Sequence, residues 1–178
     1  MIRSKLLVAT SLAVLFAGGA AFAQQQPATP APSATPAPPA AAPLPYGTAI
    51  SLENAKKMMA AAEAEAAKNN LFDVIAIVDP GGHLVMLHRM ENAQTGSVRV
   101  AEGKARTAVE FRRPTKAWED SIAGGGGGVR VLSFGVTASE GGLPIVLDGK
   151  IVGAIGVSGA PISAQDAAVA RAALDALK

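Results

Sequence analysis

Two histidines and two methionines lie close together in one short stretch of the sequence, "VIAIVDPGGHLVMLHRM", residues 74–90. His83 and His88 are the two histidines of the chain, and Met86 and Met90 are two of its five methionines. Imidazole nitrogen and thioether sulfur are ligands that iron and copper accept in proteins. This stretch is therefore the first candidate for a metal or cofactor site.

The spacing separates the two histidines if residues 83–90 form a β-strand, because side chains alternate between the two faces of a strand. His83 then lies on one face, and Met86, His88 and Met90 lie on the other. This second face suits a haem, whose iron accepts histidine or methionine and whose porphyrin needs an apolar wall. His88 is the predicted metal ligand. The alternative is a buried strand whose methionines fill the core and whose histidine is only hydrogen-bonded.

Two β-hairpins are predicted by turn residues that separate apolar runs. "DPGG" at residues 79–82 separates the runs 74–78 and 84–87, because proline fixes one φ angle and glycine accepts a positive one. After Leu143, Asp148-Gly149 separates two more apolar runs, which is a strong hairpin signal.

Helices are predicted around these hairpins from apolar residues at three- and four-residue spacing. Ser51, Ser97 and Ser163 are the predicted N-caps of three helices, and Asp166 completes a capping box with Ser163. A shorter helix is predicted over 115–122. Two hairpins with helices between them predict an α+β fold, with helices packed on an antiparallel sheet.

The N-terminus predicts export. Arg3 and Lys5 precede an apolar run that ends in "AFA", which is the layout of a signal peptide over 1–23 with cleavage after Ala23. We therefore expect a periplasmic or secreted protein that carries no membrane anchor after cleavage. Residues 24–45 are a Pro/Ala-rich tract and predict a disordered linker. Residues 46–178 then form one domain.

Charge and composition exclude several classes of function. The chain has 16 basic and 14 acidic residues, and cleavage after Ala23 would remove two basic ones, which leaves a nearly neutral chain. A neutral domain lacks the basic surface that nucleic acids require. The absence of cysteine excludes disulfides, thiolate metal sites and cysteine nucleophiles.

Two glycine-rich segments and one serine do not match catalytic or nucleotide-binding motifs. The run Gly124–Gly128 lacks the Lys-Ser/Thr of a phosphate-binding loop, so it predicts a mobile loop or a lid. The spacing in 153–159 is not that of a dinucleotide fingerprint, and Ser158 is not in a nucleophile elbow. No motif requires catalysis, and whether the protein is an enzyme stays open.

Three segments carry a resemblance to a known family: "IAIVDPGGHLVMLHRMENA", "KARTAVEFRRPT" and "GGLPIVLDGKIVGAIGVSGA". In this order they resemble the GlcG/HbpS family, whose domain also occurs at the C-terminus of some corrinoid adenosyltransferases. The resemblance implies an α+β fold, homo-oligomeric assembly and, in some members, haem binding. Carried onto this chain, it frames a cofactor site in which His88 is the preferred ligand, His83 the second, and Thr115 or Thr107 further candidates.

These features predict an exported haem-binding protein for haem storage, scavenging or sensing. One alternative is a domain that binds a small organic acid such as glycolate through Arg89, Arg112 or Arg113, because guanidinium groups pair with carboxylates. Another is a scaffold that binds a partner protein and no small molecule.

Overall fold

The computed structural model describes residues 42–178, so the predicted signal peptide and linker residues 24–41 lie outside its described part. Residues 42–45 are exposed and irregular. Among the described residues, no helix is both long enough and apolar enough to cross a membrane.

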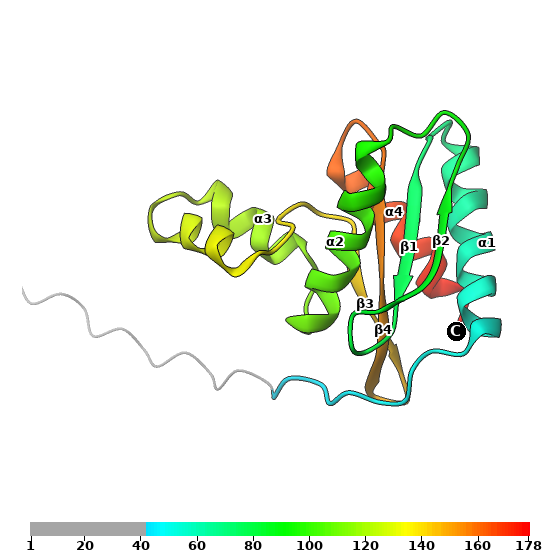
Figure 1. Ribbon diagram of the computed structural model, residues 1–178, viewed down its shortest axis with the longest axis horizontal. Helices are drawn as coiled ribbons and strands as arrows, with labels where there is room; N and C mark the ends of the chain where they lie inside the picture. The colour runs from blue at the N-terminus through cyan, green and yellow to red at the C-terminus, as the bar shows by residue number, and fades with distance from the viewer. Residues whose placement is uncertain (1–41) are drawn as a thin grey trace, which may run out of the picture. The chain divides into compact units, whose positions relative to one another are not determined.

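The centre of the fold is an antiparallel sheet of four strands in the order β2-β1-β4-β3 (Figure 1). The strands are β1 (Val74–Val78), β2 (Leu84–Arg89), β3 (Gly142–Leu147) and β4 (Lys150–Ser158). Each predicted hairpin is present, and the two hairpins join through the pairing of β1 with β4. The predicted α+β architecture is therefore confirmed.

Helices cover both faces of this sheet, as Figure 1 shows for α2 (Gly96–Glu110) and α1 (Leu52–Lys68) on opposite sides of the strands. Val74, Ala76 and Val78 of β1 pack in clusters with α2. Ile75 and Ile77 pack on the other face with α1 and α4 (Ser163–Asp175). All five residues of β1 are buried because both faces of this central strand are covered.

Close contact between α2 and β4 depends on small residues. A Cβ atom on Gly156 of β4 would lie 2.1 Å from the carbonyl oxygen of Ala101 and 2.5 Å from the amide nitrogen of Ala105. Both alanines are fully buried on α2. The helix backbone thus rests directly on the strand, and this separation leaves no room for a side chain.

The segment that we call the projecting arm, residues 116–134, extends away from the sheet (Figure 1). It consists of α3 (Lys116–Ala123), close to the predicted short helix, and the 3-10 helix η1 (Gly126–Phe134), which begins inside the run 124–128 that predicted a mobile loop or a lid. Trp118 packs edge-on against Phe111 and Phe134, with ring centroids 5.0 and 6.4 Å apart. These aromatic contacts hold η1 against α3.

Two of the predicted helix caps are wrong, whereas the Ser51 cap is confirmed by its bond from the Asn54 amide. Ser97 lies inside α2, and its hydroxyl is buried 3.3 Å from that of Ser158. Ser163 is the first residue of α4 and Ile162 occupies the N-cap, so no side chain caps this helix. The Asp166 carboxylate is bound instead to Lys104 and to the Ala160 amide.

Gly156→Ala should lower the free energy of unfolding by about 3 kcal/mol, because the added methyl group overlaps backbone atoms of α2 that cannot rotate away. Urea denaturation measures this change. Gly96→Ala is the matched control, since nothing lies within 4 Å of a Cβ at that position. Equal stability of the two variants would show that α2 does not rest on β4 in this way.

Candidate functional site

A groove of about 800 Å³ lies between α1 and the end of β2. Its volume falls within the range of small-molecule sites. The side chains from α1 and the following loop are mostly apolar, whereas polar groups come chiefly from Glu63, His88 and the Glu91-Asn92 turn. The lining residues are Ala60, Glu63, Ala64, Ala67, Asn70, Leu71, Phe72, His88, Met90, Glu91 and Asn92.

His88 stands at the wall of this groove. It pairs with Ile75 across β1 and β2, on the face of the sheet that α1 covers, and 48% of its side chain is exposed. Its Nδ1 contacts Oε1 of Glu63 on α1. Within residues 42–178, Nε2 has no hydrogen-bond partner, so one ring nitrogen is held by a carboxylate and the other is available. Histidines that bind metals in proteins have the same arrangement.

Glu63 is a residue of the candidate site that sequence reasoning missed. It lies on α1, 25 residues before His88, and its side chain is 34% exposed. A glutamate at the polar border of an amphipathic helix is ordinary in sequence. Only the packing of α1 beside β2 identifies it as the partner of His88.

The two predicted methionines separate. Met90 is half-buried and lines the groove beside His88, and its amide nitrogen donates to the carbonyl oxygen of Asp73 over 3.0 Å. Met86 is on the same face of the strand but packs against the core beneath α1 and α4. The groove therefore brings together His88, Met90 and Glu63, and not Met86.

His83 lies at the opposite end of β2 from His88. It occupies the turn between β1 and β2, its side chain is 83% exposed, and its Nδ1 is 3.3 Å from Oδ1 of Asp79. The same Asp79 oxygen accepts bonds from the backbone of Gly81 and of His83. His83 thus belongs to the turn, and the two histidines do not meet within one chain.

Thr115 and Thr107 lie near the β3 edge of the sheet, whereas β2 forms the other edge. The Thr115 hydroxyl is buried and accepts a bond from the Gly142 amide over 2.9 Å. The Thr107 hydroxyl accepts a bond from the Thr137 amide over 2.9 Å. Thr107 thus holds the segment before β3 against α2, and Thr115, just before α3, holds the first residue of β3. Ligation by either threonine stays a prediction.

The three arginines proposed as carboxylate partners are each bound to backbone carbonyls. Arg89 donates two hydrogen bonds to the carbonyl oxygen of Ala93. Arg113 donates to the carbonyl oxygen of Phe111, and its guanidinium group lies over the Trp118 ring. Arg112 donates to Leu44 and lies over the ring of Tyr46. None of the three lines the α1–β2 groove.

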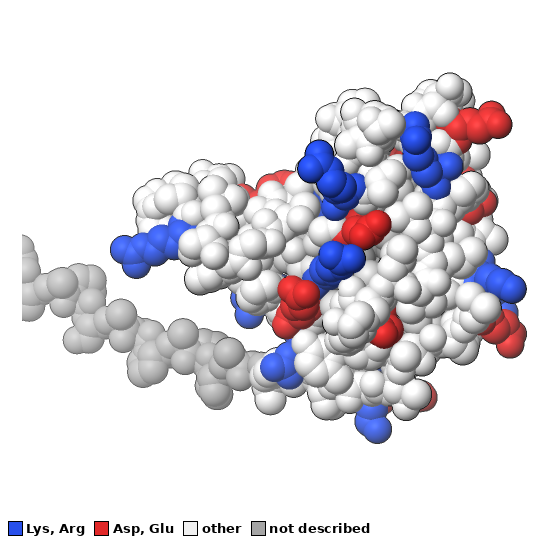
Figure 2. All heavy atoms as spheres, in the orientation of Figure 1, with Lys and Arg blue, Asp and Glu red and all other residues white. Residues whose placement is uncertain are grey.

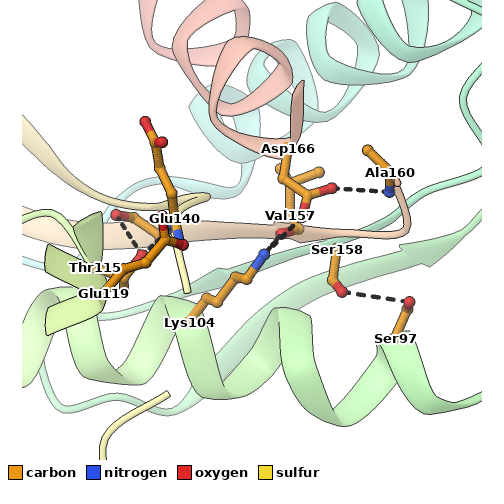
Figure 3. A network of polar contacts seen from close by, with 10 residues as sticks. Ser97, Lys104, Thr115, Glu119, Glu140, Val157, Ser158, Ala160 and Asp166 are labelled. Atoms are coloured by element: carbon orange, nitrogen blue, oxygen red, sulfur yellow. Dashed lines mark hydrogen bonds and ion pairs between the residues drawn. The ribbon is translucent and has the colours of Figure 1, made fainter. Parts of the chain in front are cut away.

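A buried ionic network connects the two helical layers (Figure 3). Lys104 extends from α2, is 1% exposed, and donates to the Val157 carbonyl over 2.9 Å and to Oδ2 of Asp166 over 2.7 Å. The second oxygen of Asp166 accepts a bond from the Ala160 amide over 3.0 Å. This network is separate from the groove, because none of these residues lines it.

The residues of the groove fit a haem better than a bare metal ion. Among residues 42–178, no group of three or more acidic or histidine side chains is placed to hold a metal ion. The groove offers instead one imidazole, one thioether and a wall of alanine, leucine and phenylalanine. This donor set suits a single axial bond to iron that a porphyrin already holds.

Comparison with known proteins places this architecture in a family. The family described as "haem degrading protein HbpS-like" matches residues 50–175. GlcG of Escherichia coli strain K12 is 43% identical over 109 residues, which are 61% of this chain and 81% of GlcG.

Solved structures agree with this sequence match. A crystal structure of HbpS from Streptomyces reticuli, a double mutant, has a TM-score of 0.68 and 32% identity, and the match covers 81% of this chain and 99% of that one. The crystal structure of the PduOC–haem complex has a TM-score of 0.66 and 30% identity, covering 72% and 95%. The chain therefore belongs to the HbpS-like family, together with GlcG.

Proposed function

We propose that the protein is an exported haem-binding protein in which His88 is the axial ligand to iron. One observation carries the proposal: an imidazole held by a carboxylate stands at the wall of an apolar groove of about 800 Å³. Membership of the HbpS-like family supports it, as does the haem complex of the PduOC neighbour.

The side chains of the groove have different roles in the proposed binding of haem. Leu71, Phe72 and the three alanines of α1 provide apolar surface for a porphyrin face, and burial of that surface supplies most of the binding free energy. Met90 provides a polarisable thioether beside the imidazole. Bound haem would supply an iron centre for storage, transfer or redox sensing.

Glu63 orients His88 and favours one tautomer of its ring. A carboxylate at Nδ1 favours the proton on that nitrogen, which leaves the lone pair of Nε2 for iron. The same contact restricts rotation of the ring. Glu63 is thus a positioning residue that acts through His88.

Export is part of the proposal and depends on the sequence of residues 1–23, which has the layout of a signal peptide. A periplasmic or secreted protein without cysteine keeps no thiol that oxidation could damage. Such a chain suits an oxidising compartment in which free haem is to be captured.

Titration of the purified protein with hemin, followed by the Soret band, should show saturable binding. His88→Ala should weaken binding at least about tenfold and change the band position, because the axial bond is lost. Glu63→Gln should weaken it by about tenfold while leaving the band close to the wild-type position, since the imidazole remains but is held less firmly.

His83→Ala is the matched control, because that imidazole is exposed in the turn at the other end of β2. It should bind hemin as the wild type does. Binding that is unchanged in His88→Ala would contradict ligation by His88, and the absence of saturable binding in the wild type would contradict the function itself.

We also propose that the protein forms homo-oligomers through the projecting arm. Val129, Leu132 and Phe134 of η1 are 48%, 58% and 59% exposed, which is unusual for apolar side chains so close together. The face of the arm seen in Figure 2 carries few charged side chains, whereas basic and acidic groups lie close together on the part of the body visible in the same view. A second copy that covers the arm would bury this surface.

Val129→Ser combined with Leu132→Ser should reduce the molar mass of the assembly measured by light scattering during gel filtration, because both side chains lose apolar contact area. Val100→Ser is the control, since Val100 is an exposed apolar residue of α2 outside the arm. A monomeric wild type, or an unchanged mass for the double variant, would exclude the arm as the interface.

A further inference from the structure

Asp73 is a buried acid that neither the groove nor the ionic network uses. It immediately precedes β1 and is 0% exposed. Within the described part of the chain, neither of its carboxylate oxygens has a hydrogen-bond partner. Burial of an ionised carboxylate without partners is costly, so a residue in this position favours its neutral form.

Two charged groups face Asp73, one from each helical layer. They are Lys104 of α2 and Asp166 of α4. The ammonium of Lys104 is already bound to Asp166 over 2.7 Å and to the Val157 carbonyl over 2.9 Å. One buried cation therefore lies near two carboxylates and is bound to only one of them, so the interior carries a surplus negative charge whenever both are ionised.

The turn after β4 packs closely against Asp73. Gly159 has a φ of +153°, and a Cβ there would lie 2.5 Å from Oδ1 of Asp73 and 2.4 Å from the Phe72 carbonyl oxygen. The backbone of the turn thus covers the carboxyl group closely. A bound proton neutralises Asp73 without displacing this backbone.

We propose that Asp73 is a buried proton-binding site that makes the junction of β1, the Gly159-Ala160 turn and α4 sensitive to pH. When Asp73 is protonated, Lys104 and Asp166 form a balanced pair and the Ala160 amide stays bound to Asp166. When it is ionised, repulsion from Asp166 loosens the turn and the start of α4. The proposal is independent of haem binding.

The direction of the effect follows from the pKa of Asp73. Burial, and then repulsion by Asp166, raise this pKa from 3.8 to about 6, although Lys104 opposes the shift. The folded state therefore keeps a proton that the unfolded state loses. The contribution of Asp73 to the free energy of unfolding therefore falls as pH rises from about 4 to 6 and is constant above that. Over this window, Asp73 alone raises the unfolding equilibrium constant about 100-fold.

Urea denaturation of Asp73→Asn and of the wild type at pH 4.5 and 7.5 tests the proposal. At pH 7.5 the unfolding equilibrium constant of the variant should be lower than that of the wild type by up to about 100-fold, because the buried charge is gone. At pH 4.5 the ratio between the two unfolding equilibrium constants should be at least about ten times smaller than at pH 7.5. Asp175→Asn, which alters an exposed acid of α4, should show no such pH-dependent difference.

Carbon-13 NMR of the Asp73 carboxyl group in the wild type tests the proposal even if the variant does not fold. The carboxyl carbon should titrate near pH 6, and the Ala160 amide should exchange with solvent faster above that pH. Titration of the carboxyl below about pH 4.5, or an equal effect of Asp73→Asn at both pH values, would overturn the proposal.

Discussion

The buried ion pair between Lys104 and Asp166 connects the two helical layers of this protein. Lys104 comes from α2 on one face of the sheet and Asp166 from α4 on the other. Gly141 makes the contact possible, because a Cβ there would lie 2.8 Å from the Asp166 Cβ and 3.0 Å from the Lys104 ammonium nitrogen. Breaking such a pair leaves an uncompensated buried charge, so the relative positions of α2, β4 and α4 are closely determined.

The position of α4 that this ion pair fixes also determines where the groove lies. With α4 fixed over β4 and β3, the β2 side of the same face is covered by α1 alone, and the groove with His88 opens there. The threonines stand near the β3 edge, where Thr107 binds the segment before that strand and Thr115 binds its first residue. Asp73 lies between these regions: its carbonyl binds Met90 of the groove, and its carboxyl faces Lys104 and Asp166.

Local features could be predicted from the sequence, and distant contacts could not. The turns at 79–82 and Asp148-Gly149 determine their hairpins through backbone preferences alone, and Ser51 caps its helix within four residues. The pairing of β1 with β4 joins residues some 80 positions apart, and no local pattern specifies it. The predicted caps at Ser97 and Ser163 are wrong. Ser97 contacts Ser158 on β4, and Asp166 of the predicted capping box binds Lys104, both through contacts between residues far apart in the sequence. The strand face that carries His88 could be predicted from alternation, whereas its contact with Glu63 depends on helix packing.

A crystal structure of the protein with hemin bound would test the central claim most directly. We expect iron bonded to Nε2 of His88 in the groove between α1 and β2, with Glu63 at Nδ1 and Phe72 and Leu71 against the porphyrin. Iron bonded to His83 or Thr115, or a haem held away from this groove, would contradict the account.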